Sequence, residues 1–235
     1  MRFERALAVF AHPDDGEFGF AGTVAKLVRE GTEMHYVCIT DGSAGSNEPG
    51  VTRDQLRPIR EREQRAAAEV LGVTECHFLG FLDGTLELNM DLRKAMTRVV
   101  RGVRPDLIIG PDPSRLWNGE RTYINHRDHR IAGEAVLTVV MPDAPSRPQF
   151  PELLDEGLEP FEVPAVWLSA EEGESVVDIT ETIDLKLRAL GCHESQLGAF
   201  PDWEDMIRGI AKERGAGAGV EYAERFTTFT LREDD

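Results

Sequence analysis

The sequence predicts an α/β fold in one domain, with a mainly parallel β-sheet covered by helices on both faces. Short, continuously apolar runs alternate along the chain with stretches of helical periodicity, and glycine or proline marks most of the boundaries between them. Strands that are apolar on both faces are typical of a parallel sheet with helices on each side. With 235 residues, 41% of them hydrophobic, the chain is long enough for one full core.

The predicted elements follow one another as strand and helix units. The first unit is a strand at 7–11 and a helix at 22–30, which Gly31 ends. Further strands are predicted at 34–40, 76–79, 107–109, 163–168 and 176–179, further helices at 57–71, 91–101, 128–140 and 184–190, and a final segment at 222–231. Repeated alternation of this kind predicts a three-layer, Rossmann-like arrangement.

Two segments are predicted to be irregular. The stretch at about 141–162 holds five prolines and cannot form a regular helix, so we expect a long surface loop, either a plain connection or an active-site lid. The stretch at about 214–219 consists mostly of glycine and alanine and is expected to be a flexible linker. No internal repeat is visible, so a single domain is predicted over residues 1–235.

The charge balance narrows the classes of partner. The chain has 26 Lys and Arg residues against 43 Asp and Glu, a formal charge of −17, which opposes binding to nucleic acid or to anionic membranes. We therefore expect a neutral or cationic small-molecule substrate. The apolar run before His12 is too short for a signal sequence, no stretch reaches membrane-spanning length, and the three cysteines lie far apart. These features predict a cytoplasmic protein without a disulfide framework or a thiolate zinc site.

Two short runs hold most of the side chains that can carry chemistry. The first follows the strand at 7–11, and the second opens the helix at 128–140. Their candidate residues are His12, Asp14, Asp15, His126, Asp128 and His129. Because both runs follow strands where the strand order of such a sheet reverses, we expect them to meet. Three of the six histidines fall in these runs, which predicts a metal site with an adjacent general base.

The spacing leaves four candidate metal ligands. His12 and Asp15 are three residues apart, and His126 and His129 repeat that offset at a helix entry. A catalytic Zn²⁺ takes about three protein ligands and keeps one position for water, although Fe²⁺, Co²⁺ or Mn²⁺ also suit such donors. Asp14 points differently from Asp15 and is expected to act as general base, with both carboxylates ionised. Asp128 is expected to hydrogen-bond a ring nitrogen.

Taken together, these motifs resemble the LmbE-like or PIG-L family of zinc-dependent N-deacetylases. The similarity extends over most of the chain and includes the AHPDD run at 11–15, GTVAK at 22–26 and TDG at 40–42. It continues with Arg60 and Glu63, RPD at 104–106, HRDH at 126–129, and KLRAL at 186–190 leading into HESQ at 193–196. The chain departs from the family pattern at Arg127, where a proline is frequent, and it has no tyrosine two residues before His126.

The resemblance implies a role for each matched residue. The implied zinc ligands are His12, Asp15 and His129. Asp14 is implied to activate the water, and His126 to stabilise the oxyanion or protonate the leaving amine, with Asp128 orienting it. The implied substrate contacts are Arg60, Asp83 and His193. His35 and His77 lie in strands without acidic partners at ligand spacing, so we interpret both as structural.

The implied activity is removal of an acetyl group from the amide nitrogen of an N-acetylated amino sugar or sugar conjugate. A metal-dependent amidase acting on a thiol conjugate or another amide is an alternative, and the resemblance also implies a homo-oligomer. A dinucleotide-binding module is a distant alternative, because Gly16, Gly19 and Gly22 follow the first strand. Their spacing is G-x-x-G-x-x-G, and the carboxylates of this turn would repel a pyrophosphate.

Overall fold

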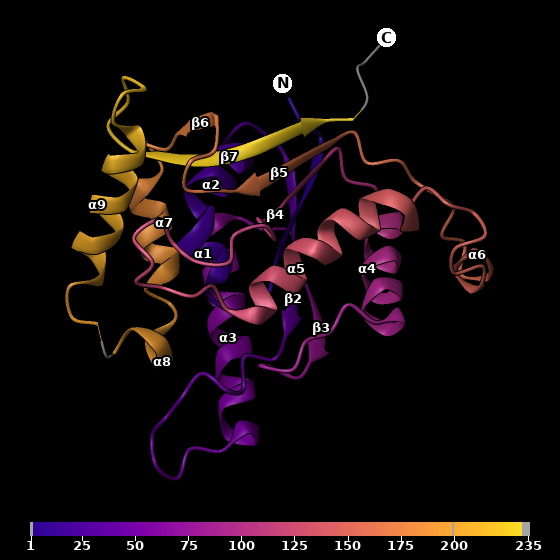
Figure 1. The fold of residues 1–235 in the computed structure, drawn as a ribbon, viewed down its shortest axis with the longest axis horizontal. Helices are drawn as coiled ribbons and strands as arrows, with labels where there is room; N and C mark the ends of the chain where they lie inside the picture. Colours follow the sequence, from indigo (N-terminus) through magenta and orange to yellow (C-terminus); the bar gives the residue numbers. More distant parts are fainter. Residues whose placement is uncertain (1, 199, 232–235) are drawn as a thin grey trace.

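A seven-stranded sheet runs through the middle of the computed structural model, which describes residues 2–198 and 200–231 (Figure 1). Its strand order is β3-β2-β1-β4-β5-β7-β6. The strands are β1 (Arg5–Phe10), β2 (Glu33–Thr40), β3 (Glu75–Phe81), β4 (Leu107–Pro111), β5 (Ala165–Ser169), β6 (Ser175–Asp178) and β7 (Ala223–Thr230). β1 to β5 pair in parallel, whereas β7 runs antiparallel to β5 and to β6.

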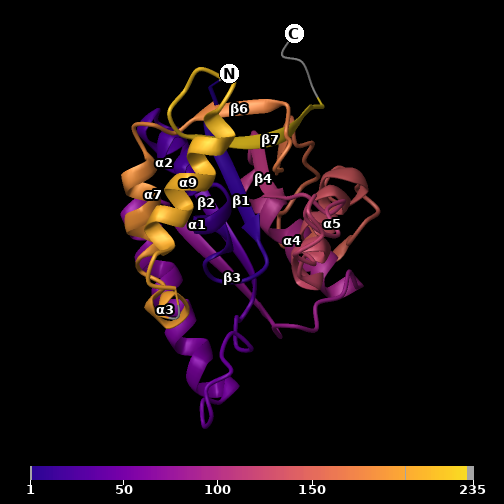
Figure 2. The same ribbon diagram turned by 60° about the vertical axis from the view of Figure 1, so that its left-hand side comes forward.

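Helices cover both faces of this sheet (Figure 2). One face carries α2 (Ala21–Arg29), α3 (Arg53–Leu71), α7 (Ile183–Leu190) and α9 (Trp203–Gly215), and the other carries α4 (Met90–Val103) and α5 (Arg127–Thr138). Short helices α1 (Asp15–Gly19), α6 (Glu152–Asp155) and α8 (Glu194–Leu197) lie in the connections. The predicted three-layer, mainly parallel α/β fold is confirmed.

The central strand β1 positions the candidate site. Its side chains alternate between the two layers: Ala8 and Phe10 pack under α2 and α3, while Leu7 and Val9 pack under α4 and α5. The chain continues from β1 to β2 on one side and later returns to β4 on the other side of β1. The connections after β1 and β4 therefore diverge at their carboxyl ends, which is where ligands bind in sheets of this type.

Helix α3 begins four residues before the predicted helix at 57–71. Thr52 accepts a hydrogen bond from the amide of Gln55, and the Gln55 side chain accepts one from the amide of Thr52. This reciprocal capping box satisfies two backbone donors at the helix start. Pro58 lies within the helix near its start, and the predicted start at residue 57 is next to this proline.

The predicted linker at 214–219 is partly wrong, because Arg214 and Gly215 form the end of α9. The helix at 203–215 is not predicted from the sequence, although Ile207 and Ala211 are four residues apart and buried. Charged residues and Gly209 break the apolar periodicity that marks the other helices. The turn residues that follow, 216–219, lead into β7.

The proline-rich stretch at 141–162 is held in place by Arg101 of α4. The π-helical turn η1 (Val139–Asp143) begins this stretch, and the buried Arg101 guanidinium donates to carbonyl oxygens of Asp143, Ala144, Ser146 and Gln149. The stretch leaves from the carboxyl end of α5, whereas His126 and His129 lie at the amino end, about 18 Å away along a 12-residue helix. This placement favours a fixed connection over a lid.

Candidate active site

The turn after β1 brings His12, Asp14 and Asp15 to the sheet edge. The amide of His12 donates to Asp15 Oδ2 at 2.7 Å, and the amide of Asp15 donates to the His12 carbonyl at 3.2 Å. Asp14 has a φ of 100°, a left-handed conformation that costs energy for a residue with a side chain. Its amide donates to Gln64 Oε1 at 2.9 Å, which holds this conformation from α3. Gly42 packs so closely on Pro13 that a Cβ there would lie 2.8 Å from Pro13 Cδ.

Three donor atoms converge beside this turn. His12 Nδ1 lies 3.2 Å from Asp15 Oδ2 and 3.2 Å from His129 Nε2, and His129 Nε2 lies 3.0 Å from Asp15 Oδ1. Tetrahedral ligands at zinc distances would stand about 3.3 Å apart. The two imidazoles and the carboxylate therefore fit one divalent ion, and the predicted meeting of the two runs is observed.

The charges around the two imidazoles support that fit. Burial disfavours the charged form of His12, but Asp15, Asp128 and Asp83 outweigh it and raise the pKa of His12 to about 12. Burial is likewise outweighed at His129, where Asp15 raises the pKa of the ring. The carboxylates thus stabilise positive charge at this point. A divalent cation would supply that charge and leave both rings neutral, as metal ligation requires.

Each of these histidines has an acceptor near its other ring nitrogen. His129 Nδ1 lies 3.2 Å from Asn125 Oδ1. Because the amide oxygen accepts a hydrogen bond, the imidazole proton is on Nδ1, and Nε2 is free to bind a metal. His12 Nε2 lies 3.1 Å from Asp83 Oδ1 and 3.4 Å from Asp128 Oδ2, although neither contact has good hydrogen-bond geometry. Acceptors of this kind fix the tautomer of a metal-binding histidine. Asn125, four residues before His129, had no predicted role.

Asp14 projects toward α3 instead of the three converging donors. Its Oδ2 lies 3.0 Å from Arg60 Nη2, and 13% of its side chain is exposed. Burial raises the pKa of Asp14 to about 7, against the opposing attraction of Arg60. A carboxylate with a pKa near neutrality is suited to accept and release a proton.

His126 caps the amino end of α5. Its Nδ1 accepts a hydrogen bond from the amide of Asp128 at 3.2 Å, which leaves the proton on Nε2. Burial, His12 and His129 lower the pKa of His126. The ring is therefore neutral, with its proton on Nε2 as a hydrogen-bond donor.

The carboxylate of Asp128 lies elsewhere than expected. It accepts hydrogen bonds from the amides of Gly84 at 2.7 Å and Leu86 at 3.3 Å, so it holds the loop after β3 and faces His12. The prediction that this carboxylate orients His126 is wrong, because only the backbone amide of Asp128 reaches that ring.

The three predicted substrate residues are all buried. Arg60, 3% exposed, donates to the carbonyl oxygens of Pro13 and Gly42 and pairs with Asp14. Asp83 accepts from the amide of Ala44 and contacts His12. His193 is fully buried, with Nε2 3.2 Å from Glu17 Oε2. None of these three side chains is among the residues that line the pocket beside the converging donors.

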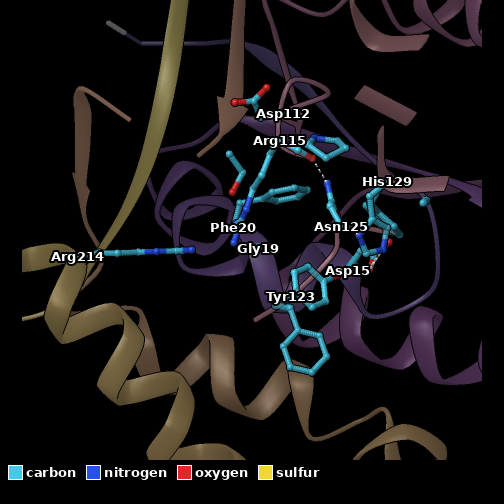
Figure 3. Close-up of a pocket in the computed structure, with 14 residues that line it drawn as sticks. Asp15, Gly19, Phe20, Asp112, Arg115, Tyr123, Asn125, His129 and Arg214 are labelled. Atoms are coloured by element: carbon cyan, nitrogen blue, oxygen red, sulfur yellow. Dashed lines mark hydrogen bonds and ion pairs between the residues drawn. The ribbon is translucent and has the colours of Figure 1, made fainter. Parts of the chain in front are cut away.

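A pocket of 240 Å³ opens beside the converging donors (Figure 3). Asp15 and His129 lie on one side of it, and Arg214 of α9 reaches in from the opposite side. Tyr123 and Arg115 line both this pocket and an adjoining cavity of 660 Å³ along α9. The three converging donors therefore lie at one end of a longer cleft.

The position of a dinucleotide phosphate is occupied. Glu224 of β7 accepts hydrogen bonds from the amides of Gly22 and Thr23 at the amino end of α2, at 3.0 and 2.7 Å. A buried carboxylate at that helix end excludes a pyrophosphate.

In residues 2–198 and 200–231, no helix has the length and apolar character needed to cross a membrane.

Known proteins are similar to this chain in sequence and in structure. The profile of the PIG-L family, described as GlcNAc-PI de-N-acetylase, matches residues 7–140. The diacetylchitobiose deacetylase of Thermococcus kodakarensis is 35% identical over 231 residues, covering 94% of this chain and 81% of that protein. A probable N-acetyl-α-D-glucosaminyl L-malate deacetylase 2 of Bacillus anthracis is 32% identical, covering 83% of each chain. The solved N,N′-diacetylchitobiose deacetylase of Pyrococcus horikoshii, in complex with an inhibitor, superposes with a TM-score of 0.88 at 32% identity, covering 97% of this chain and 84% of that one.

Proposed function

The chain belongs to the PIG-L family of de-N-acetylases, and we propose that it is a zinc-dependent hydrolase that removes the acetyl group from an N-acetylated amino sugar or sugar conjugate. The observation that carries the proposal is the convergence of His12 Nδ1, Asp15 and His129 Nε2 within 3.2 Å of one another, at one end of a cleft. Asp14 and His126 flank these donors and supply the proton chemistry that amide hydrolysis needs.

His12, Asp15 and His129 are the residues that would hold the ion. Two imidazoles and one carboxylate are a donor set that favours Zn²⁺, although Fe²⁺, Co²⁺ and Mn²⁺ also suit it. When bound, the cation acidifies a water molecule and polarises the amide carbonyl. Asp83 and Asp128 also approach His12, but they lie at Nε2, whereas Asp15 and His129 lie at Nδ1, so we assign Asp83 and Asp128 to orienting the ring.

Asp14 is assigned as the general base. It takes a proton from the attacking water and later delivers it to the leaving amine nitrogen, which departs as a free amine together with acetate. Its pKa of about 7 keeps a substantial ionised fraction at neutral pH. Arg60 stabilises that ionised form and, through the Pro13 carbonyl, fixes the turn on which Asp14 stands.

His126 is assigned as the oxyanion donor. Because the amide of Asp128 donates to Nδ1, the ring holds its proton at Nε2. That N–H can donate to the carbonyl oxygen as negative charge develops on it during attack. The ring centroid of His126 lies 4.8 Å from that of His12, which places the donor beside the three converging ligands.

The cleft supplies the room for a substrate larger than a single amide. The 240 Å³ pocket next to His129 is large enough for the acetamido end of a sugar, and the adjoining 660 Å³ cavity can hold the rest of a conjugate. Tyr123 and Arg115 line both spaces, and Arg214 projects into them from α9. We assign these three side chains, in place of the buried Arg60, Asp83 and His193, to substrate contact.

The three cysteines are free, which supports work in a reducing compartment such as the cytoplasm.

The proposal is tested by measuring released acetate and amine together with bound metal. We expect purified protein to hold zinc and to deacetylate N,N′-diacetylchitobiose or another N-acetylglucosamine conjugate. Asp14→Asn should keep the metal and lose nearly all turnover, whereas His12→Ala should lose both.

A matched control is Asp54→Asn, because it removes the same charge from an exposed position of α3. If Asp14→Asn turned over substrate at the wild-type rate, the assignment of the base would be wrong. If the protein hydrolysed thiol-linked amides and left every acetamido sugar intact, the amidase alternative would replace the proposed activity.

A further inference from the structure

A second group of metal-ligating side chains lies at the opposite end of the sheet. Glu33 and His35 are two residues apart on β2, and Glu75 and His77 are two residues apart on β3. The strands pair in parallel with His35 opposite Glu75, so all four side chains stand on the same face. They lie near the amino ends of these strands, whereas His12 follows the carboxyl end of β1.

The geometry of this group resembles a ligand set. His35 Nδ1 lies 3.4 Å from His77 Nε2, and the two rings are stacked with centroids 5.6 Å apart and planes 15° from parallel. Glu75 Oε2 lies 3.9 Å from the first of these nitrogens and 3.8 Å from the second. Zinc ligands in a tetrahedron stand about 3.3 Å apart, so a small movement of the exposed Glu75 side chain suffices to close the set.

Glu33 fixes the ring of His35 in the tautomer that a metal requires. Its Oε1 lies 3.1 Å from His35 Nε2 and accepts the proton of that nitrogen. The lone pair of His35 Nδ1 is then directed toward His77 Nε2 and the Glu75 carboxylate. A carboxylate behind a histidine in this way is the usual second partner of a metal-binding imidazole.

We propose that His35, Glu75 and His77 form a second site for a divalent transition-metal ion, with Zn²⁺ as the expected ion. Two imidazoles and one carboxylate suit zinc, and the solvent-facing side of the set leaves a fourth position for water. From the sequence alone, His35 and His77 are interpreted as structural, because neither has an acidic partner at ligand spacing. The partners are present, but Glu75 reaches His35 only through the pairing of the two strands.

An ion at this site would fasten β3, an edge strand whose side chains are mostly half-buried, to β2. The carboxyl end of β3 leads directly to Asp83 and Gly84, which contact His12 and Asp128. The ion would therefore support the active site from a distance by holding the strand that carries this loop. Because it binds the folded chain, it would also raise the thermal unfolding temperature.

The test is a zinc titration of the purified protein, followed by calorimetry and elemental analysis. We expect the wild type to bind one equivalent more than His77→Ala and one more than Glu75→Gln, whatever the first site holds. Glu33→Gln should weaken that additional equivalent by about 10- to 100-fold. The additional equivalent should raise the unfolding temperature of the wild type and leave that of His77→Ala unchanged.

Glu69→Gln on α3 is the matched control, since it removes the same charge at an exposed position outside the group. It should bind zinc like the wild type. Glu75→Gln should fold like the wild type, because Glu75 is exposed and its loss leaves no buried group unpaired. Equal zinc stoichiometry in the wild type, His77→Ala and Glu75→Gln overturns the proposal.

Discussion

Replacing Arg60 by glutamine should move the acid limb of the activity profile to higher pH. Arg60 Nη2 lies 3.0 Å from Asp14 Oδ2, so the two charge centres are about 4 Å apart. In an effective dielectric of about 20 that pair attracts by about 4 kcal/mol, equivalent to about 3 pKa units. Arginine neighbours lower the pKa of aspartates by about 1 to 3 units in proteins.

The sign of the effect follows from the role of Asp14. Loss of the guanidinium removes an attraction that favours the ionised carboxylate, so the pKa of Asp14 rises above its present value of about 7. As a base, Asp14 works only when ionised. At pH 7 its ionised fraction would fall from about half to about a tenth for a rise of one unit, and to about a hundredth for two. A bound cation lowers the pKa of Asp14 in the wild type and in Arg60→Gln alike. The pKa of Asp14 therefore remains higher in the variant than in the wild type.

The assay is kcat/KM measured from about pH 5 to about pH 10, which reports the free enzyme. Arg60→Lys keeps the charge and should keep most of the acid limb in place. Arg62→Gln removes the same charge from an exposed position of α3 and should behave like the wild type. An unchanged acid limb in folded, metal-loaded Arg60→Gln would refute the coupling between Arg60 and Asp14.

Three other predictions concern separate parts of the structure. His126→Ala should lower kcat by about 10²- to 10³-fold at unchanged metal content, since one oxyanion donor is lost; steady-state kinetics with elemental analysis checks this. Lys186→Met should lower the free energy of unfolding by about 3 to 5 kcal/mol, because it leaves the fully buried Glu224 without the ammonium at 2.6 Å; urea denaturation measures it, and Lys186→Met with Glu224→Gln should recover part of the loss. Arg214→Ala should raise KM about tenfold for a conjugate that fills the cleft and leave kcat unchanged; an unaltered KM across a panel of conjugates would remove Arg214 from the substrate contacts.

The layers and the meeting of the two reactive runs could be predicted from local patterns. Strands such as β1 are continuous apolar runs, and their polar neighbours follow at the carboxyl ends. His12 and His129 are separated by 117 positions, yet the reversal of strand order at β1 and β4 is enough to bring them together. The spacing of charged residues within each run then indicated a metal site.

The surroundings of the reactive runs could not be predicted, because they depend on packing between distant elements. Arg60 is on a helix with many other arginines, and the sequence does not show that this one turns inward to the Pro13 carbonyl. His193 meets Glu17 only because α7, which His193 follows, packs against α1. The link between His35 and Glu75 depends in the same way on the register of two strands.

The carboxylate of Glu224 at the start of α2 joins the two ends of the polypeptide. The segment matched by the family profile ends at residue 140, so it contains all three zinc-binding candidates, but the side chain that holds the amides of Gly22 and Thr23 arrives on the last strand. β7 lies between β5 and β6, so these amides at the start of α2 are capped by a strand distant in sequence. Removing β7 should therefore weaken α2 and the adjoining α1, which begins at Asp15, although β7 supplies none of the proposed catalytic residues.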